Sequence, residues 1–582
     1  MEYKDTSGIV GKIRGTIMLG AFCLCWGLLQ PCAWASGRAE ARILAPSAWQ
    51  GAPQVTTRFG LLQGYADSDE TWSWKGVPYA RPPVGRFRWR APVDPEPWMG
   101  IRKARSFGGR AAQYTPLLTW IISGSEDCLY LNVWRPMGDH AGLPVYVWIH
   151  GGGNSIGASD FVQDYYGHAL AHAADMVVVT VNYRIGPFGW FSLPALREGI
   201  SPEDDSGNYG TLDLLHALKW VQGNIGAFGG DPSNVTIAGE SAGAMHVLSL
   251  LISPLSRGLF AKAVVESGMT STRGLQEAEE RANAVLQTLL FRDGKTRGLS
   301  DAASAAAAMT PERIRAYLRG KSDREILRCY SGGSMGMIDN PAILRDGYVL
   351  PRVGFGVWDE ENLPNKVPIL IGSNKEELKL FLGFAMDWKS DLFAAAARFG
   401  SDRWKAAGVD GIARRLSSIH GHPPVFAYLF SWGAPNAEGI SPLPGEWGVH
   451  LGAFHSLEIP FFMGTDTIEG DFLTPVLFTR ENKTGRKALS RSIMDYLGAF
   501  ARSGNPNRTG SGLPVWSPWS NDPTGPKSII FDVDGEAPAI SMDTRELSLE
   551  SVDQAMKKEL SAELYKQARE YILGFPGGSS GE

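Results

Sequence analysis

The sequence has few cysteines and no excess of basic residues. Five of its 582 residues are cysteine, and three of these lie before residue 36. Only Cys128 and Cys329 remain, so one disulfide at most can form and the fold must be held together by its core. The 56 Lys and Arg residues are outnumbered by 61 Asp and Glu, a net charge of -5. We therefore expect no nucleic-acid partner, since a phosphate-binding face normally needs basic residues in excess.

Long apolar runs are also missing, except near the N-terminus. Lys12 and Arg14 precede an apolar run over residues 16–29, and Ala33-Trp34-Ala35 is the small-x-small pattern after which a signal peptidase cuts. The run is shorter than the roughly 20 residues that span a bilayer. We predict a signal peptide over residues 1–35, a periplasmic or secreted protein, and no stable membrane insertion after cleavage. An uncleaved membrane anchor is the alternative.

The rest of the sequence alternates between short buried strands and helices, which predicts an α/β protein with a largely parallel sheet. We expect residues 36–53 to lead into a single domain over 54–573, and a disordered tail over 574–582. Within the domain, 275–329 is interpreted as a helical excursion covering one side of the sheet. Strand patterns lie at 128–134, 145–150, 176–182, 234–240, 261–266, 367–372, 426–432 and 529–533, and helical patterns at 211–224, 242–252, 275–329, 486–503 and 552–573.

The stretch Asn234–Gly243 is typical of a nucleophile elbow. A strand-like run ends on Ser241, with Gly239 and Gly243 two residues to either side, and a helical pattern follows. A serine can attack a carbonyl carbon only where its oxygen projects from a sharp turn, and flanking glycines remove the side chains that would collide there. The following helix would direct its free N–H groups toward the reacting centre.

Serine acyl transfer also needs oxyanion donors, a base and a group that orients the base. His150-Gly151-Gly152-Gly153 follows a predicted strand and could bring backbone N–H groups close to a carbonyl oxygen; a simple tight turn is the alternative. In α/β hydrolases the base lies downstream of the serine. Spacing alone leaves the choice open between the candidate bases His420, His422, His450 and His455 and between the candidate acids Glu376 and Glu377.

Further motifs occur in order along the chain: Gly76-Val77-Pro78-Tyr79-Ala80, Pro82-Pro83-Val84-Gly85, Ser125-Glu126-Asp127-Cys128-Leu129-Tyr130-Leu131-Asn132, Asn182-Tyr183-Arg184-Ile185-Gly186, Gly207-Asn208-Tyr209-Gly210 with Asp213, Phe228-Gly229-Gly230-Asp231-Pro232, and Phe500-Ala501 with Gly504-Asn505-Pro506-Asn507. Together with the elbow they resemble the type-B carboxylesterase family, the branch of the α/β-hydrolase superfamily that includes the cholinesterases and bacterial para-nitrobenzyl esterases. The resemblance covers nearly the whole chain from Val55 onward. It implies an α/β-hydrolase fold, with a mostly parallel twisted sheet flanked by helices and helical excursions that form a cap around an active-site gorge.

The resemblance also implies roles for individual residues. The nucleophile would be Ser241 and the general base His455. The family's acid lies in a Gly-x-Asn-x-x-Glu pattern, matched by Gly372-Ser373-Asn374-Lys375-Glu376-Glu377, which favours Glu377 over Glu376. The remaining implied residues are Gly152, Gly153 and Ala242 as oxyanion donors, Ser267 as a second-layer residue, and Arg88 with Glu126 as a structural ion pair. No metal or organic cofactor is implied.

Several residues depart from the family pattern. No cysteine lies between Ser36 and Asp127, so the motif cysteine Cys128 lacks its usual upstream partner. Asn154 stands where an aromatic residue usually follows the glycines, and His246 where a serine usually follows the elbow. Both departures lie near the expected reacting centre, so we expect a more polar acyl pocket, with a structural role for His246 as the alternative.

The sequence thus predicts a serine carboxylesterase that hydrolyses small-molecule esters through an acyl-enzyme intermediate. One alternative is a catalytically silent, cholinesterase-like binding or adhesion domain, although such proteins usually lose a triad residue and this chain has all three. Another is the same triad acting on an amide, a thioester or a specialised natural-product ester, because the motifs are common to all of these. The sequence leaves the oligomeric state open.

Overall fold

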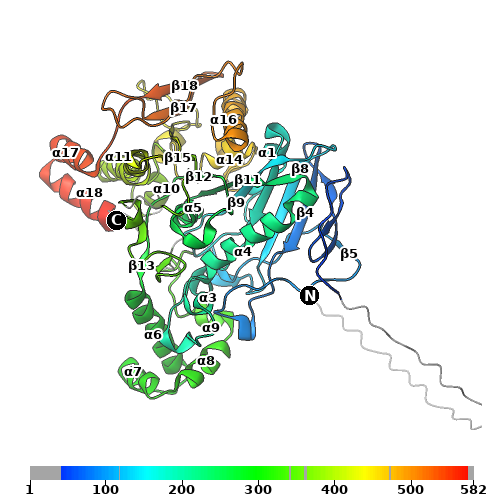
Figure 1. The fold of residues 1–582 in the computed structure, drawn as a ribbon. Helices are drawn as coiled ribbons and strands as arrows, with labels where there is room; N and C mark the ends of the chain where they lie inside the picture. Colours follow the sequence, from blue (N-terminus) through cyan, green and yellow to red (C-terminus); the bar gives the residue numbers. More distant parts are fainter. Residues whose placement is uncertain are drawn as a thin grey trace, which may run out of the picture. The chain divides into compact units, whose positions relative to one another are not determined.

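A mixed sheet of 11 strands forms the centre of the molecule (Figure 1). The computed structural model describes residues 41–574 except 117, 334, 340, 341, 360–362, 384, 471 and 472. Neighbouring strands are parallel from β17 through to β10, and antiparallel strands complete both edges. The predicted largely parallel sheet is therefore confirmed. In spatial order the strands are β18 (Ala537–Asp543), β17 (Ser528–Asp534), β16 (Val425–Phe430), β15 (Ile369–Asn374), β12 (Lys262–Glu266), β11 (Gly230–Glu240), β9 (Leu143–Ile149), β10 (Val177–Val181), β8 (Tyr130–Pro136), β4 (Thr71–Pro78) and β3 (Tyr65–Asp67).

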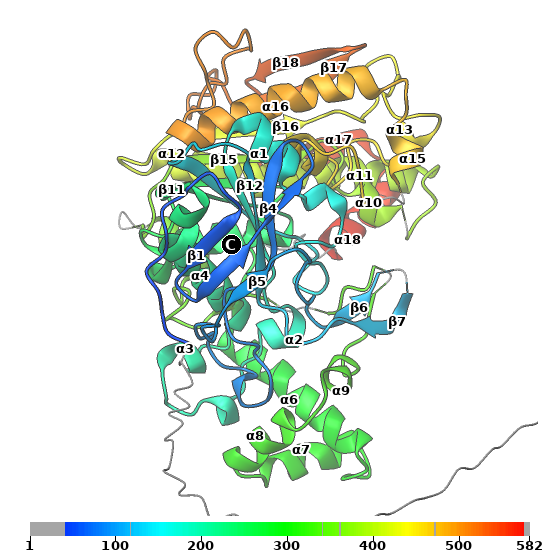
Figure 2. The ribbon, with the colours of Figure 1, turned by 90° about the vertical axis from the view of Figure 1, so that its right-hand side faces the viewer.

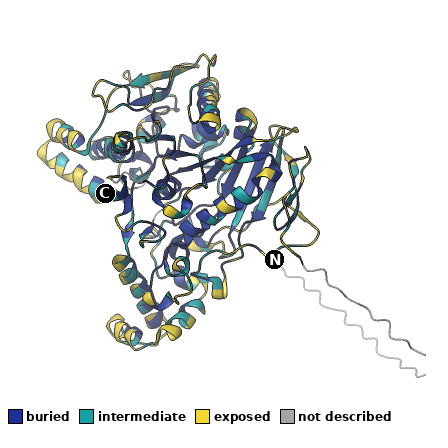
Figure 3. Cartoon of the chain, viewed as in Figure 1, coloured by how far each residue is buried: buried dark blue, intermediate teal, exposed yellow. Residues whose placement is uncertain are grey.

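The two faces of the sheet are covered by different helices. In β9, Val145 and Val147 belong to one hydrophobic cluster and Tyr146 and Trp148 to another, because successive side chains point to opposite faces. Every residue of β9 and β10 is buried, as expected for strands covered on both sides (Figure 3). The first cluster includes side chains of α4 (Tyr209–Asn224) and α5 (Ala242–Ile252), and the second those of α1 (His168–Ala174), α14 (Ile459–Met463) and α16 (Lys483–Ser503).

The predicted helical excursion is present, but it projects beyond the sheet (Figures 1 and 2). Its buried residues, among them Leu286, Leu289 and Leu318, join the hydrophobic cluster of α4 and α5. The described residues from Arg42 onward form one compact unit. The helices of the excursion are α6 (Leu275–Arg292), α7 (Leu299–Ala307), α8 (Pro311–Arg319) and α9 (Asp323–Leu327).

The predicted last helix, 552–573, is wrong in one respect, because it is divided in two. The structure has α17 (Leu549–Glu559) and α18 (Ala562–Gly574), separated at Leu560, whose backbone is extended (φ -100°, ψ 153°). The Ser561 hydroxyl accepts a hydrogen bond from the Leu564 N–H at 3.3 Å. A serine that caps a new helix offers the backbone an alternative to continuing the old one, and this outweighs the continuous helical pattern.

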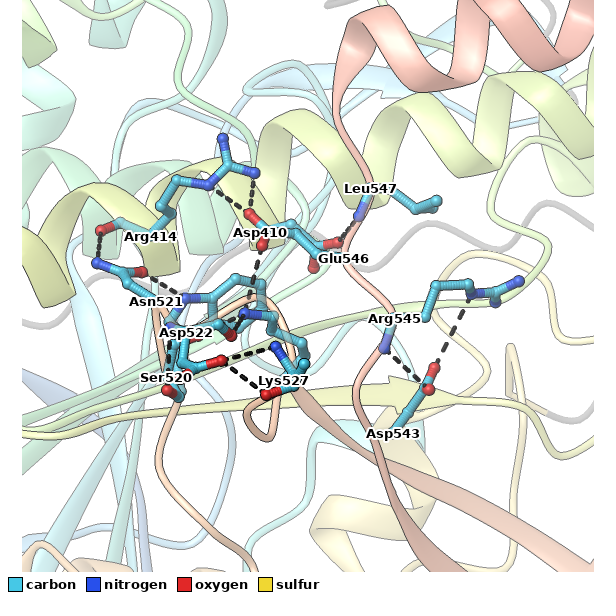
Figure 4. A network of polar contacts seen from close by, with 12 residues as sticks. Asp410, Arg414, Ser520, Asn521, Asp522, Lys527, Asp543, Arg545, Glu546 and Leu547 are labelled. Atoms are coloured by element: carbon cyan, nitrogen blue, oxygen red, sulfur yellow. Dashed lines mark hydrogen bonds and ion pairs between the residues drawn. The ribbon is translucent and has the colours of Figure 1, made fainter.

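A polar network attaches the C-terminal segment to the middle of the chain (Figure 4). Asp410 accepts hydrogen bonds from the Leu547 N–H at 2.7 Å and from Lys405 Nζ at 2.6 Å. Glu546 pairs with Arg414 and lies 3.3 Å from Lys527. Asp410 ends a π-helical turn (Ala406–Asp410) between α11 (Asp391–Lys405) and α12 (Gly411–Ser418). The network therefore fixes the C-terminal end of this turn.

Among the described residues, the best-buried ion pair links two of the sequence motifs. Arg184 donates to Asp213 through Nε at 2.8 Å and Nη2 at 2.7 Å, and both side chains are at most 2% exposed. We predict that Asp213→Ala lowers the free energy of unfolding by about 3–5 kcal/mol, because it leaves a buried guanidinium without its partner. Urea unfolding would measure this. Glu559→Ala, which breaks the exposed pair with Arg398, is the control and should cost about 1 kcal/mol or less; equal losses would contradict the prediction.

Two sequence predictions lie outside the described residues, namely the signal peptide over 1–35 and all of the predicted tail except Gly574. Gly574 itself ends α18. Within the described part of the chain, no helix combines the length and the apolar character that crossing a membrane requires.

Candidate active site

The serine at the end of β11 occupies a sharp, strained turn. Ser241 has φ 56° and ψ -121°, a conformation that a non-glycine residue adopts at a cost of about 1–3 kcal/mol. A Cβ on Gly239 would lie 2.6 Å from the Gly243 carbonyl carbon, and one on Gly243 would lie 2.0 Å from the Ile149 oxygen. Both positions therefore exclude any side chain. The helix α5 begins at Ala242, as the elbow pattern predicted.

The glycine loop after β9 lies against this serine. A Cβ on Gly151 would be 3.1 Å from Ser241 Cβ, so the loop and the elbow are in direct contact. Gly152 and Gly153 have positive φ angles of 102° and 59°. Among the described residues, the N–H groups of Gly152 and Gly153 donate no hydrogen bond, and Ala242, as the first residue of α5, has no acceptor within its helix. These donors are free to bind a ligand oxygen.

Of the candidate acids and bases, the structure pairs His455 with Glu377. His455 Nδ1 lies 2.5 Å from Glu377 Oε2, and the other Glu377 oxygen accepts the Asn374 N–H at 2.7 Å. The second ring nitrogen of His455, Nε2, is in ion-pair contact with the carboxyl group of Glu240. The Glu376 side chain instead accepts a hydrogen bond from the Ala453 N–H at 3.0 Å and forms an ion pair with Lys379 at 2.7 Å.

The other candidate histidines make different contacts. His450 stacks between the rings of Trp388 and Trp447, at centroid distances of 5.1 and 5.4 Å. The Nδ1 of His422 lies 2.7 Å from the Pro423 oxygen, and His420 is exposed. Of these four histidines, only His455 has an ion-pair contact with a carboxylate.

Three buried glutamates near the predicted site residues, Glu240, Glu266 and Glu458, were not predicted from the sequence. Glu458 lies 2.5 Å from the Ser267 hydroxyl, which donates to it, and burial together with Glu377 raises the pKa of Glu458 to about 7. Burial likewise raises the pKa of Glu240 and of Glu266 well above the ordinary range. In the sequence, each glutamate lies within three residues of a predicted site residue. This proximity is the signal that could have identified the three glutamates as part of the site.

Glu240 also acts on the histidine. Its Oε1 lies 3.0 Å from His455 Nε2. Burial lowers the pKa of His455, but the charges of Glu240 and Glu377 outweigh it and raise that pKa above its ordinary value. The histidine is therefore held in a cluster of carboxyl groups that favours the imidazolium.

Asn154 and His246, the two departures near the elbow, contact each other. Asn154 Oδ1 lies 2.8 Å from His246 Nε2, and both side chains are buried. The His246 ring stacks on Trp190 at 5.1 Å, and burial, aided by His150, lowers its pKa to about 3. His246 is thus neutral; its Nε2 meets Asn154 Oδ1, while its buried Nδ1 makes no hydrogen bond within the described chain.

The structure also locates the predicted Arg88–Glu126 ion pair and the two cysteines. The Arg88 Nε donates to both oxygens of Glu126 at 2.7 Å, in a buried pair. Cys128 and Cys329 are free thiols. The described residues contain no group of three or more His, Cys, Asp or Glu side chains that could hold a metal ion.

These elements define a class of protein. A strand, a serine at a strained turn and a helix form an elbow, a glycine loop lies beside it, and a histidine paired with a carboxylate comes from loops after later strands. This arrangement, in the chain order serine, acid, histidine, is that of the α/β hydrolases.

Comparison with known proteins narrows the class. The model of the carboxylesterase family matches residues 51–410 and 398–536. The para-nitrobenzyl esterase of Bacillus subtilis is 33% identical over an alignment of 489 residues, and the match covers 79% of this chain and 92% of that protein. The medium-chain fatty acyl-CoA hydrolase precursor of Anas platyrhynchos is 32% identical over an alignment of 570 residues, and the match covers 90% of this chain and 93% of that protein. A crystal structure of a Geobacillus stearothermophilus carboxylesterase superposes with a TM-score of 0.64 at 30% identity, covering 84% of this chain and 98% of the other.

The chain belongs to the carboxylesterase family. It is a carboxylic ester hydrolase with the α/β-hydrolase fold, as the sequence motifs predicted.

Proposed function

We propose that this esterase uses Ser241 as its nucleophile, His455 as its general base and Glu377 as the acid that orients the base. The observation that carries the proposal is the 2.5 Å contact between His455 Nδ1 and Glu377, which orients the imidazole. The elbow contributes a serine whose backbone strain is maintained by the surrounding glycines. A strained serine and an oriented imidazole are two of the groups that serine acyl transfer requires.

The reaction would proceed in two halves. The Ser241 hydroxyl gives its proton to His455 Nε2 while its oxygen bonds to the ester carbonyl carbon, and the N–H groups of Gly152, Gly153 and Ala242 stabilise the resulting oxyanion. His455 then returns the proton to the departing alcohol, which leaves an acyl-serine. Water repeats the sequence on the acyl-serine and releases the carboxylic acid.

Asn154, His246 and Ser267 would serve as positioning residues. Asn154 has a positive φ of 58° directly after the glycines, and the Gly186 N–H donates to its backbone oxygen at 2.6 Å. Its side-chain contact with His246 joins the glycine loop to α5. Ser267 would hold Glu458 near Glu377.

Labelling with a fluorophosphonate would test the assignment. We expect one adduct, on Ser241, and no labelling of Ser241→Ala; an adduct that persists in this variant would contradict the proposal. Rates on para-nitrophenyl esters of increasing acyl length, compared with the matching thioesters and amides, would then define the preferred bond. Esters are expected to react fastest.

Export is proposed on the basis of the N-terminal sequence. Lys12, Arg14, the apolar run 16–29 and Ala33-Trp34-Ala35 have the order of a signal peptide. The mass of the protein recovered outside the cytoplasm should correspond to a chain that begins at Ser36; a chain that keeps residues 1–35 would contradict cleavage.

A pH prediction follows from the contact between Glu240 and His455. His455 must be neutral to accept the serine proton. A raised pKa means that the imidazole becomes neutral only at higher pH, so activity should rise with pH through the pKa of His455. Glu240→Gln removes the carboxyl group that lies 3.0 Å from Nε2 and whose charge, when it is ionised, favours the imidazolium. We expect the acid limb of the kcat/KM profile to move to lower pH by about one pH unit, since such a charge typically shifts a pKa by about 1–3. An unchanged limb, or one moved to higher pH, would contradict the prediction.

A further inference from the structure

The hairpin β6 (Gln113–Thr115) and β7 (Leu118–Ser123) has no part in the proposed chemistry, yet it exposes large apolar side chains. Trp120 is 75% exposed, Leu118 43% and Ile121 42%. Among the described residues the two strands pair only with each other, and Figure 2 shows them standing away from the central sheet. Large apolar groups gathered on one projecting element mark an interaction site.

The sequence of the hairpin contains no charge. Residues 111–125 include no Asp, Glu, Lys, Arg or His. The apolar groups also lie on both faces of the strand, because the adjacent residues Trp120 and Ile121 point in opposite directions. A flat protein surface would cover one of these faces, whereas a fluid lipid phase can surround both. Tryptophan is moreover a residue that favours the boundary between lipid and water.

Basic side chains flank the base of the hairpin. The Tyr114 hydroxyl donates to the backbone oxygens of Leu327 and Tyr330, both at 3.1 Å, which attaches β6 to the end of α9. Arg292 and Arg328 are exposed there, and Arg292 Nη1 donates to the Arg328 oxygen at 2.7 Å. Their charges reach the Tyr114 hydroxyl, where they oppose the burial that raises its pKa. An apolar element beside arginines is complementary to an anionic lipid surface.

The hairpin is also connected to the glycine loop. The Gln113 side chain accepts the Gly157 N–H at 2.8 Å and donates to the Gly157 oxygen at 2.9 Å. The segment after α9 contacts both sites, since a Cβ on Gly336 would lie 3.2 Å from the Tyr114 oxygen and one on Gly153 would lie 3.0 Å from the Met337 sulfur. An anchored hairpin would hold the glycine loop close to the anchoring surface.

We propose that the β6–β7 hairpin docks the protein on an anionic phospholipid surface, with Trp120, Leu118 and Ile121 entering the interface and Arg292 and Arg328 contacting the headgroups. Esters dissolved in the lipid would then meet the active site without first dispersing in water. The docking does not depend on the assignment of the catalytic residues.

Vesicle flotation would test the proposal with the full chain. Wild-type protein should float with vesicles of phosphatidylcholine and phosphatidylglycerol, and less with phosphatidylcholine alone. The triple variant Leu118→Ser, Trp120→Ser, Ile121→Ser should lower the partition coefficient by about tenfold or more, and Arg292→Gln and Arg328→Gln by about fivefold each on the anionic vesicles. Val515→Ser, which changes a side chain that is 67% exposed between α16 and β17, is the control and should bind as wild type.

Each outcome of these experiments supports or overturns the docking proposal. Wild-type protein that fails to float, or a triple variant that floats equally well, overturns the docking. If wild type fails to float and ultracentrifugation shows a dimer that the triple variant loses, the hairpin is instead a contact between two copies. Arginine variants that bind like wild type overturn the headgroup contact. Turnover of a water-soluble short-chain ester should be unchanged in the triple variant, which separates this test from that of the catalytic residues.

Discussion

Ser241→Ala is expected to lower kcat for a para-nitrophenyl ester by about 10⁶-fold, the loss seen when the nucleophile of a serine hydrolase is removed. The alanine cannot form the acyl-enzyme, so only binding and the oxyanion donors remain. Steady-state rates on one short-chain ester would measure the loss. The fold should persist, because only one oxygen is removed from the turn.

Ser241→Gly provides the matched comparison. Glycine adopts φ 56° without strain, so this variant should be as inactive as Ser241→Ala while it unfolds at a higher temperature, through relief of roughly 1–3 kcal/mol. If Ser241→Ala kept activity within tenfold of wild type, another group would have to be the nucleophile.

Glu377→Gln is expected to lower kcat by about 10⁴-fold, as the corresponding amide substitution does in serine proteases. The amide can donate to His455 Nδ1, which stabilises the wrong tautomer and places a proton on Nε2. The base then has no lone pair for the serine proton. Glutamine also carries no charge to stabilise the imidazolium, so both halves of the reaction should slow.

Glu376→Gln is the control for this prediction. The two glutamates are adjacent in sequence, but Glu376 faces Ala453 and Lys379 instead of His455. We expect its kcat to stay close to wild type, with a small loss of stability from the weakened contact with Lys379. A large loss for Glu376→Gln together with near-normal activity for Glu377→Gln would reverse the assignment.

Local patterns in the sequence predicted much of the scaffold. Helix α5 begins and ends where its pattern placed it, at Ala242 and Ile252. The strands that form the middle of the sheet were predicted within a few residues, because strands buried on both faces are continuous apolar runs. The last helix was the exception, since one capping serine divides a continuous pattern.

The spacing of residues along the sequence predicted the candidate site only in part. Four histidines and two glutamates fitted the order of an α/β hydrolase, and the choice of His455 and Glu377 came from resemblance to the family. The structure brings these two together across 78 positions of the chain. Their catalytic roles, and those of Ser241 and the oxyanion donors, stay predictions until the variants above are measured.

By itself, the sequence determined the elbow, the glycine loop, the parallel sheet and the family. These features are local, because glycines and apolar periodicity act on neighbouring residues. Only the tertiary structure decided that Glu240 and Glu458 lie near His455, that Asn154 contacts His246 across 92 positions, and that Trp120 faces outward. Such contacts depend on how the fold brings distant strands and loops together. The hydrophobic periodicity of one segment does not show which distant residues will pack against that segment.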